Sequence, residues 1–257
     1  MPLLRLTAMV AAGLLSAPAA VASGPEPAAV LATALPAVVR IDVVKRVQPV
    51  AGRGEFQQQL DRLLERAERA AADPREESGS GFVVDSAAGL VAAAEFVVSN
   101  AESITLLLHD GRTVAAELVA SDEESQLALL RAAVAGLPTL EWGDSEKLRR
   151  GDPVYAAGHQ FNLGLLVTGG IHSGVIGPSD RTSGREYLAT DAPVMLGNAG
   201  GPLLDAAGRV VGVVIGNFGT SMDRSLGIAV PASIARPVLE RLREGAASPA
   251  GADVEGQ

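Results

Sequence analysis

The glycine-rich stretch at residues 197–204 constrains this chain more than any other part of the sequence. It reads Gly-Asn-Ala-Gly-Gly-Pro-Leu-Leu and precedes an apolar run at residues 210–216 that is long enough for a buried strand. Glycines allow a tight turn in which the backbone N–H groups of Gly197, Asn198 and Ala199 point to one side. Such a turn has the outline of an oxyanion hole, where backbone donors stabilise a developing negative charge.

The composition favours strands and turns over a helical bundle. The 257 residues include 29 glycines and 15 prolines, and 47% are hydrophobic although only 3% are aromatic. The core must therefore be built mainly from Val, Leu, Ile and Ala side chains. A chain of this length can hold one large domain or two small ones.

Cysteine and charge exclude several classes of function. The sequence contains no cysteine, which excludes disulfides, thiol chemistry and cysteine-ligated zinc. Its formal net charge is −9, and an acidic protein of this kind is a poor partner for nucleic acid. Only three histidines occur, so we expect no histidine-rich metal site and no cofactor.

The first 22 residues have the features of a secretory signal. Arg5 supplies the positive end, residues 6–15 supply a short apolar core, and Ala-Val-Ala at 20–22 is a small-residue cleavage site. The apolar core is short for a bilayer span, so a retained anchor is the less favoured alternative. We expect an exported, periplasmic protein that has no membrane contact after signal cleavage.

Two sets of strands are predicted along the remaining chain. They are expected at residues 35–44, 78–85, 90–93, 103–109, 112–120 and 127–131, and then at 154–157, 165–176, 186–190, 202–204, 210–216 and 226–229. Asp110-Gly111 is a strong hairpin signal between two strands of the first set. Each set suits a closed six-stranded antiparallel barrel, and residues 137–151 form the crossover between the two sets.

The expected domains follow from these strands. They are a signal peptide at 1–22, an N-terminal barrel at 23–143 with an inserted loop at about 46–77, a C-terminal barrel with a closing helix at 144–244, and a disordered tail at 245–257. Pro231 is expected at the start of the closing helix. Residues 54–72 of the inserted loop have helical apolar spacing. That helix would either pack on its own domain or contact another subunit.

Six short motifs together resemble the protease domain of the HtrA (high-temperature-requirement A) family. They are Leu-Pro-Ala-Val-Val at 35–39, Gly-Ser-Gly-Phe-Val-Val at 79–84, Asp-Gly-Arg at 110–112, Gly-Asp-Ser at 143–145, Thr-Asp-Ala at 190–192 and Gly-Ile-Ala-Val-Pro at 227–231. The resemblance implies an all-β fold of two six-stranded antiparallel barrels with chymotrypsin-like architecture. The PDZ domains that typically follow in this family do not fit into residues 245–257.

The resemblance also assigns positions to the family's catalytic triad, and other residue types occupy all three. Phe96 is at the histidine position, Gln126 at the aspartate position and Ala199 at the serine position. Phenylalanine cannot accept a proton, glutamine carries no charge to stabilise an imidazolium, and alanine offers no nucleophile. The resemblance therefore implies a pseudoprotease with no catalytic residues, which is not an enzyme.

The sequence offers no replacement triad. His109 is expected in a solvated hairpin turn, His159 in a loop of the second barrel, and His172 on a strand or its bend. Ser173 follows His172 directly, and neighbouring residues on a strand point to opposite faces. These two residues are therefore a poor nucleophile–base pair.

Features for binding a peptide remain. The turn keeps an oxyanion-hole remnant, and the next strand resembles the edge on which the family lays an extended substrate, here Val213, Val214, Ile215, Gly216 and Asn217. A peptide can add to such an edge as an extra strand. Apolar pockets would be formed by Val194, Met195, Leu196, Val213 and Ile215. Alternatively, these side chains fill the second barrel, or Met195 and Leu196 plug the groove.

The expected function is capture of extended or unfolded peptide segments without cleavage. One alternative is a regulatory scaffold that assembles as a trimer, either with itself or with an active HtrA-like protease. A serine endopeptidase with a relocated mechanism is less favoured, because no set of nucleophile, base and orienting acid can be assembled.

Overall fold

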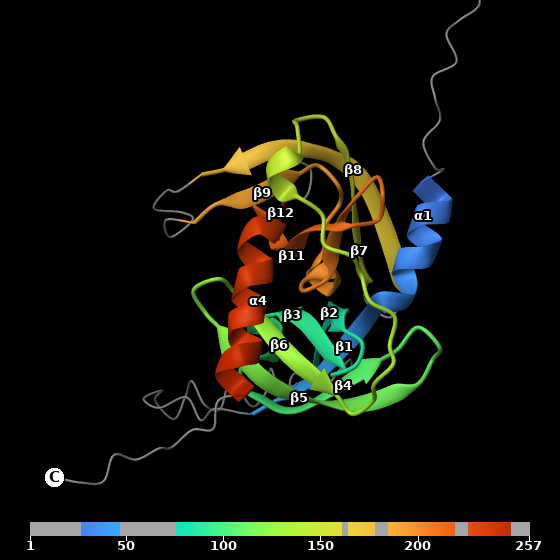
Figure 1. The fold of residues 1–257 in the computed structure, drawn as a ribbon, viewed down its shortest axis with the longest axis vertical. Helices are drawn as coiled ribbons and strands as arrows, with labels where there is room; N and C mark the ends of the chain where they lie inside the picture. Colours follow the sequence, from blue (N-terminus) through green and yellow to red (C-terminus); the bar gives the residue numbers. More distant parts are fainter. Residues whose placement is uncertain (1–26, 47–75, 161–163, 178–184, 219–225, 248–257) are drawn as a thin grey trace, which may run out of the picture.

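The computed structural model describes residues 27–46, 76–160, 164–177, 185–218 and 226–247 (Figure 1). The predicted signal peptide, the predicted helix at 54–72 and most of the predicted disordered tail lie outside the described residues. No helix in the described segments is both long and apolar enough to cross a membrane.

Within the described residues, the chain forms the two closed six-stranded antiparallel barrels that the sequence predicts. The first barrel has the strand order β1-β2-β3-β6-β5-β4 and closes where β4 pairs with β1. Its strands are β1 (Val38–Lys45), β2 (Glu76–Asp85), β3 (Leu90–Ala94), β4 (Ala101–Leu107), β5 (Thr113–Asp122) and β6 (Leu127–Ala132).

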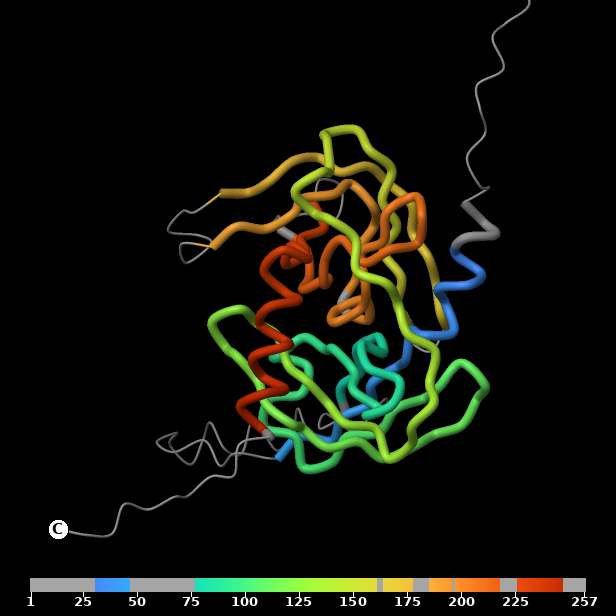
Figure 2. The backbone as a smooth tube through the Cα atoms, viewed as in Figure 1, coloured from blue at the N-terminus to red at the C-terminus, as the bar shows by residue number. Residues whose placement is uncertain are grey.

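The second barrel has the order β10-β11-β12-β9-β8-β7 and closes where β7 pairs with β10. Its strands are β7 (Pro153–His159), β8 (Leu165–Ile176), β9 (Tyr187–Thr190), β10 (Pro202–Asp205), β11 (Val210–Phe218) and β12 (Leu226–Pro231). Figure 2 shows the chain passing from the first barrel, in blue and green, to the second, in yellow and orange.

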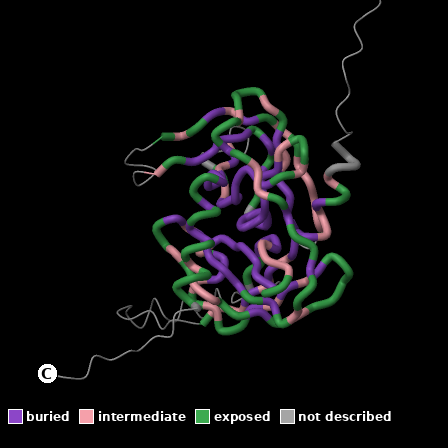
Figure 3. Tube along the Cα trace, viewed as in Figure 1, coloured by how far each residue is buried: buried purple, intermediate pink, exposed green. Residues whose placement is uncertain are grey.

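One hydrophobic cluster joins the two barrels. It contains Val38 and Phe82 of the first barrel, Leu204 and Val213 of the second, and Val238 of the closing helix, all of them buried. Figure 3 shows buried segments in both barrels and exposed segments on the outer loops. Because both barrels contribute to this shared core, the junction between them is held by apolar packing.

The crossover between the barrels is anchored by Trp142. Its ring packs edge-on against Phe82 with centroids 5.7 Å apart, and its backbone bridges to Val210 of β11. The predicted crossover also contains the 3-10 helix η2 (Ser145–Lys147), where the Asp144 carboxylate accepts a hydrogen bond from Glu146 N–H at 3.1 Å.

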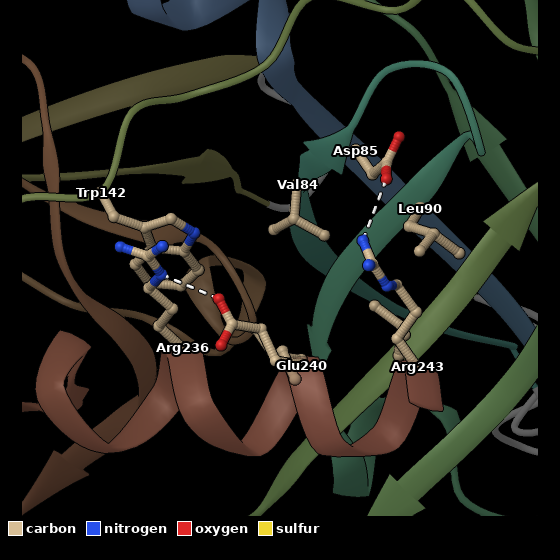
Figure 4. A pocket seen from close by; sticks show the side chains of 9 residues that line it. Val84, Asp85, Leu90, Trp142, Arg236, Glu240 and Arg243 are labelled. Atoms are coloured by element: carbon tan, nitrogen blue, oxygen red, sulfur yellow. Dashed lines mark hydrogen bonds and ion pairs between the residues drawn. The ribbon is translucent and has the colours of Figure 1, made fainter. Parts of the chain in front are cut away.

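The closing helix α4 (Ala232–Ala247) runs from the second barrel back onto the first. In Figure 4, Arg236 and Glu240 pair along the helix, and Arg243 reaches Asp85 of β2. The helix is longer than predicted, so residues 245–247 are helical and not part of a disordered tail. Pro231 is the last residue of β12 and not the first of the helix.

The prediction of a strand at residues 35–44 is wrong for residues 35–37. Residues Pro27–Ala34 form the helix α1, and Leu35–Ala37 form the 3-10 helix η1, so β1 begins at Val38. The α1 sequence Pro-Ala-Ala-Val-Leu-Ala-Thr-Ala contains four alanines, and alanine has the highest helix propensity. β-branched residues dominate only from Val38 onward, where extended structure is favoured.

Candidate functional site

The positions assigned to the histidine and aspartate of a triad are neighbours in the first barrel. Phe96 lies in the short helix α3 (Glu95–Val98), which follows β3. Gln126 directly precedes β6 and has a left-handed backbone φ of 61°. Its carbonyl accepts a hydrogen bond from Glu95 N–H at 2.9 Å. The backbone therefore holds these two positions next to each other.

Ala199, at the serine position, belongs to the second barrel but is hydrogen-bonded to the first barrel. It follows the 3-10 helix η3 (Leu196–Asn198), and its carbonyl accepts a hydrogen bond from Ser80 N–H of β2 at 2.8 Å. A Cβ atom on Gly79 would lie 3.1 Å from Ala199 O and 2.8 Å from Val97 Cγ1. Strand β2 therefore lies between α3 and the turn and brings the three positions together.

The side chains at these positions offer no proton-transfer group. Phe96 is 36% exposed, Gln126 is half-buried and Ala199 is completely buried. Lys45 Nζ donates a hydrogen bond to the Phe96 carbonyl at 2.9 Å, but this contact involves the backbone of α3. An acid–base relay needs a titratable side chain at the reacting centre, and none of the three residues has one.

Ser80 fastens the glycine-rich turn to β7. Its hydroxyl donates a hydrogen bond to Gly197 O at 2.6 Å and accepts one from His159 N–H at 2.8 Å, and both bonds are buried. Gly200 has a left-handed φ of 86°, and a Cβ atom there would overlap Ser80 O and lie 2.7 Å from Ala94 N. Only glycine fits this position, because both the conformation and the space exclude a side chain.

The backbone donors of the turn are partly satisfied within the protein. Asn198 N–H donates to Met195 O at 2.9 Å, as the 3-10 conformation requires, and Gly200 N–H donates to Val214 O at 2.7 Å. The Asn198 N–H is therefore used by the turn itself. That Gly197 and Ala199 present donors to a ligand stays a prediction.

Buried polar atoms surround this turn. The Asn198 side chain is completely buried, and within the described residues neither its Oδ1 nor its Nδ2 has a hydrogen-bond partner. The same holds for His159 Nδ1 and Gln160 Nε2 at the end of β7. Backbone contacts place these residues together, since a Cβ atom on Gly158 would lie 2.9 Å from the Asn198 Cα atom. A buried polar atom without a partner costs stability.

The histidines lie in three different environments. His109 is exposed in the turn between β4 and β5, as predicted. His159 was expected in a loop, but it is the last residue of β7 and is buried. Burial, with a smaller contribution from Arg40, lowers the pKa of His159 to about 4, whereas Asp42 acts in the opposite direction. His172 is buried in β8, and burial lowers its pKa as well.

Metal binding receives no support from this arrangement. The described segments contain no group of three or more His, Asp or Glu side chains placed to hold a metal ion.

The strand edge predicted to bind a peptide is partly open. β12 pairs with β11 from Gly212 to Phe218, whereas β10 pairs with it only from Val210 to Val213. Among the described residues, the edge beyond Val214 therefore has a strand on one side only. Asn217 is exposed on this stretch, and its Nδ2 donates to Val194 O at 3.4 Å.

The apolar residues expected to form pockets at this edge have other positions. Val213 and Ile215 are buried in the core that joins the two barrels. Val194 is also buried, whereas Met195 is 38% exposed. The side chain of Leu196 lies outside the described part, so a plug formed by Met195 and Leu196 stays a prediction.

Comparison with known proteins identifies the family. Residues 79–213 match the model of the trypsin-like peptidase domain. Because this match covers more than half of the chain, the chain belongs to the trypsin-like peptidase family.

Within that family, the chain is a homologue of HtrA-like serine proteases. It is 32% identical over 225 residues to the periplasmic pH-dependent serine endoprotease DegQ of Escherichia coli (strain K12). This alignment covers 85% of this chain and 48% of DegQ. It is 33% identical over 238 residues to the putative serine protease HhoA of Synechocystis sp. (strain ATCC 27184 / PCC 6803 / Kazusa), covering 86% of this chain and 58% of HhoA. The chain thus spans about half the length of these curated relatives.

Solved structures give the same result. The HtrA-type protease AlgW with a tripeptide superimposes with a TM-score of 0.70 at 29% identity, covering 86% of this chain and 64% of AlgW. These matches confirm the fold and the HtrA-like ancestry that the sequence motifs imply.

Sequence reasoning did not assign roles to two features of this region. In the sequence, Ser80 is only one residue of a family motif, whereas in the structure its hydroxyl joins both barrels. A polar residue between two glycines in an apolar strand is the signal that could have revealed it. Arg185 and Tyr187 were not singled out either, although they line a cavity beside the site.

Proposed function

We propose that this HtrA-like homologue is exported and binds extended or unfolded peptide segments without cutting them. The observation that carries this proposal is the occupation of three adjacent triad positions by Phe96, Gln126 and Ala199. A nucleophile, a base and an orienting acid are then missing from the place where the fold would align them.

The histidines offer no substitute base. His159 contacts the turn through Ser80, but its ring is buried and burial lowers its pKa to about 4. Ala199 also provides no hydroxyl from which a base could remove a proton. Backbone donors and binding alone retain only a small part of the rate acceleration of a triad protease.

Peptide binding is supported by the open edge of β11. Main-chain hydrogen bonds along residues 215–217 would provide affinity that depends little on sequence, as in other cases of strand addition. The related protease AlgW has been solved with a tripeptide and with a decapeptide. Export is supported by the signal-like residues 1–22 and by relatives that are named periplasmic.

Fluorescence anisotropy of labelled, unfolded casein tests this function directly. We expect anisotropy to rise when the purified protein is added and to stay high for hours. A fall below the starting value would mean cleavage and would contradict the proposal. No change would exclude peptide capture and favour the alternative of a scaffold that acts through a partner subunit.

A pair of competitor peptides tests the binding mode. An unlabelled decapeptide of alternating Val and Thr should displace casein. The same peptide with proline at every second position should not, because proline lacks the N–H donor needed for strand pairing. Equal displacement by the two peptides would contradict binding at the strand edge.

Stepwise restoration of the triad tests the absence of catalysis. We expect Ala199→Ser to cleave no casein, because Phe96 and Gln126 still prevent proton transfer. The matched variant carries Phe96→His, Gln126→Asp and Ala199→Ser together. If only the triple variant cleaves casein, the absence of proteolysis is due to these three residues. If Ala199→Ser alone cleaves casein, our assignment of the triad positions is wrong.

A further inference from the structure

A cavity of about 540 Å³ opens at the side of the molecule, between the two barrels and α4. Its walls come from the turn between β5 and β6, from the chain just before and at the start of β9, from the end of β12, and from α4. Its size is within the range of small-molecule sites. The lining includes Ser125 but not Phe96, Ala199 or the edge of β11, so the cavity is separate from the peptide-binding edge.

Apolar side chains form one part of the lining. Tyr187, Val230 and Val238 are each at most 7% exposed and contribute to the core that joins the barrels. Ile234, in the first turn of α4, is 36% exposed and also lines the cavity. A ligand with an apolar body would remove this surface from water, which favours binding.

Ser125 and charged side chains form the rest of the lining, and most of the charged groups have a partner or are hydrated. Arg241 lies 3.7 Å from the Asp122 carboxylate. Glu124 and Glu186 are exposed, so their carboxylates remain in contact with water.

Arg185 differs from these charged residues. Its Nε atom is buried, and in the described part of the chain it has no hydrogen-bond acceptor. A buried donor on a permanently charged guanidinium is costly without an acceptor. A carboxylate fits a guanidinium best, because two parallel N–H···O bonds can form between them.

We infer that this cavity binds a carboxylate attached to an apolar body, with the carboxylate on Arg185 and the apolar body against Tyr187 and Ile234. Two sources share this chemistry: the C-terminal residue of a peptide that ends in an apolar side chain, and a small free acid of similar shape. The inference does not rest on the proposed function, because it uses no residue of the peptide-binding edge.

Isothermal titration calorimetry with matched acids and amides tests the inference on the full chain. N-acetyl-leucine should bind, and its neutral amide should bind at least about tenfold more weakly, because the amide loses the charged hydrogen bonds. A hexapeptide ending in leucine is titrated in its free-acid and amidated forms. Binding of both acids indicates that the site takes a small acid, and binding of the peptide acid alone indicates a chain terminus. Equal binding of acid and amide, or binding of neither acid, would overturn the inference.

Variants at Arg185 link the binding to this cavity. Arg185→Gln should weaken binding of the acid by about tenfold or more, and Arg185→Lys should weaken it less, because the charge remains without the planar fork. Arg209→Gln is the matched control, since Arg209 pairs with Asp205 away from the cavity. An unchanged affinity in a folded Arg185→Gln variant would place the acid elsewhere. If Arg185→Gln does not fold, the comparison of Arg185→Lys with Arg209→Gln decides.

Discussion

The two barrels differ in how they accommodate buried polar groups. In the described part of the first barrel, no buried side-chain nitrogen or oxygen lacks a hydrogen-bond partner. All the exceptions belong to the second barrel or its loops, namely His159, Gln160, His172, Arg185 and Asn198. Both barrels have cores of Val, Leu, Ile and Ala, so overall apolarity does not explain the difference.

The positions assigned to a proton relay lie in the first barrel, and the residues that shape the glycine-rich turn lie in the second. The first barrel provides the positions of Phe96 and Gln126, where no titratable side chain is present. The second barrel provides the turn and the strand edge, and it contains buried polar groups that packing alone does not favour. The contrast supports our proposal that binding architecture persists in a molecule without a catalytic relay.

Glycine substitutions in the two barrels should give the largest contrast. Gly200→Ala should destabilise the protein by about 4 kcal/mol or more, for two reasons. The new Cβ atom would overlap backbone atoms of Ser80 and Ala94, and alanine would be strained in the left-handed conformation. Gly111→Ala, with a φ of 84° and open space around it, should cost only about 1 kcal/mol. Urea unfolding of both variants checks this, and similar losses would mean that the turn can relax.

Removal of the Ser80 hydroxyl should have the next largest effect. Ser80→Ala leaves Gly197 O and His159 N–H buried without their partner, which should cost about 3 kcal/mol. Ser99→Ala is the matched control, since the Ser99 hydroxyl donates an exposed hydrogen bond to the Phe96 carbonyl at 3.1 Å, and its loss should cost about 0.5 kcal/mol. Equal midpoints for the two variants in urea would show that Ser80 does not fasten the turn.

Acid should weaken the second barrel through His159. Its pKa is about 4 in the folded protein and about 6.5 when unfolded, so between these values only the unfolded chain takes up the proton. Stability is therefore lost as the pH falls, by about 2 kcal/mol between pH 7 and pH 5. Urea unfolding at both pH values should show a smaller loss of stability in His159→Gln than in the unmodified protein. Replacement of the exposed His109 should leave the loss of stability unchanged. An identical pH dependence in His159→Gln would contradict the assignment.

The ion pair between α4 and the first barrel should matter least. Arg243 Nη1 lies 3.3 Å from the Asp85 carboxylate, and both side chains are accessible to solvent. Arg243→Gln should cost only about 0.5 kcal/mol, and this small loss should disappear in high salt. A loss above 2 kcal/mol would indicate that α4 depends on charge more than on the apolar packing of Val238 and Leu239.

The strands were predictable because their signals are local. The run at 165–176 is predicted with the same boundaries as β8, since its β-branched residues and flanking glycines need no tertiary information. The sequence analysis predicts no helix at α1, and the 3-10 turn at Leu35–Ala37 is included in the strand because it directly precedes a β-branched run. The sequence underestimates the length of α4, because the small and polar residues 245–257 are typical of a disordered tail.

The sequence by itself determined the chemistry that is possible at the site, because residue type decides whether a proton or an electron pair is available at Phe96, Gln126 and Ala199. It also determined the two barrels, through strand and turn signals that act over a few residues. Only the tertiary structure decided that Ser80 links the turn to β7, that His159 is buried, and that Arg185 faces a cavity between the barrels. These features depend on contacts between residues that are distant in the chain, and such contacts form only when the two barrels pack together.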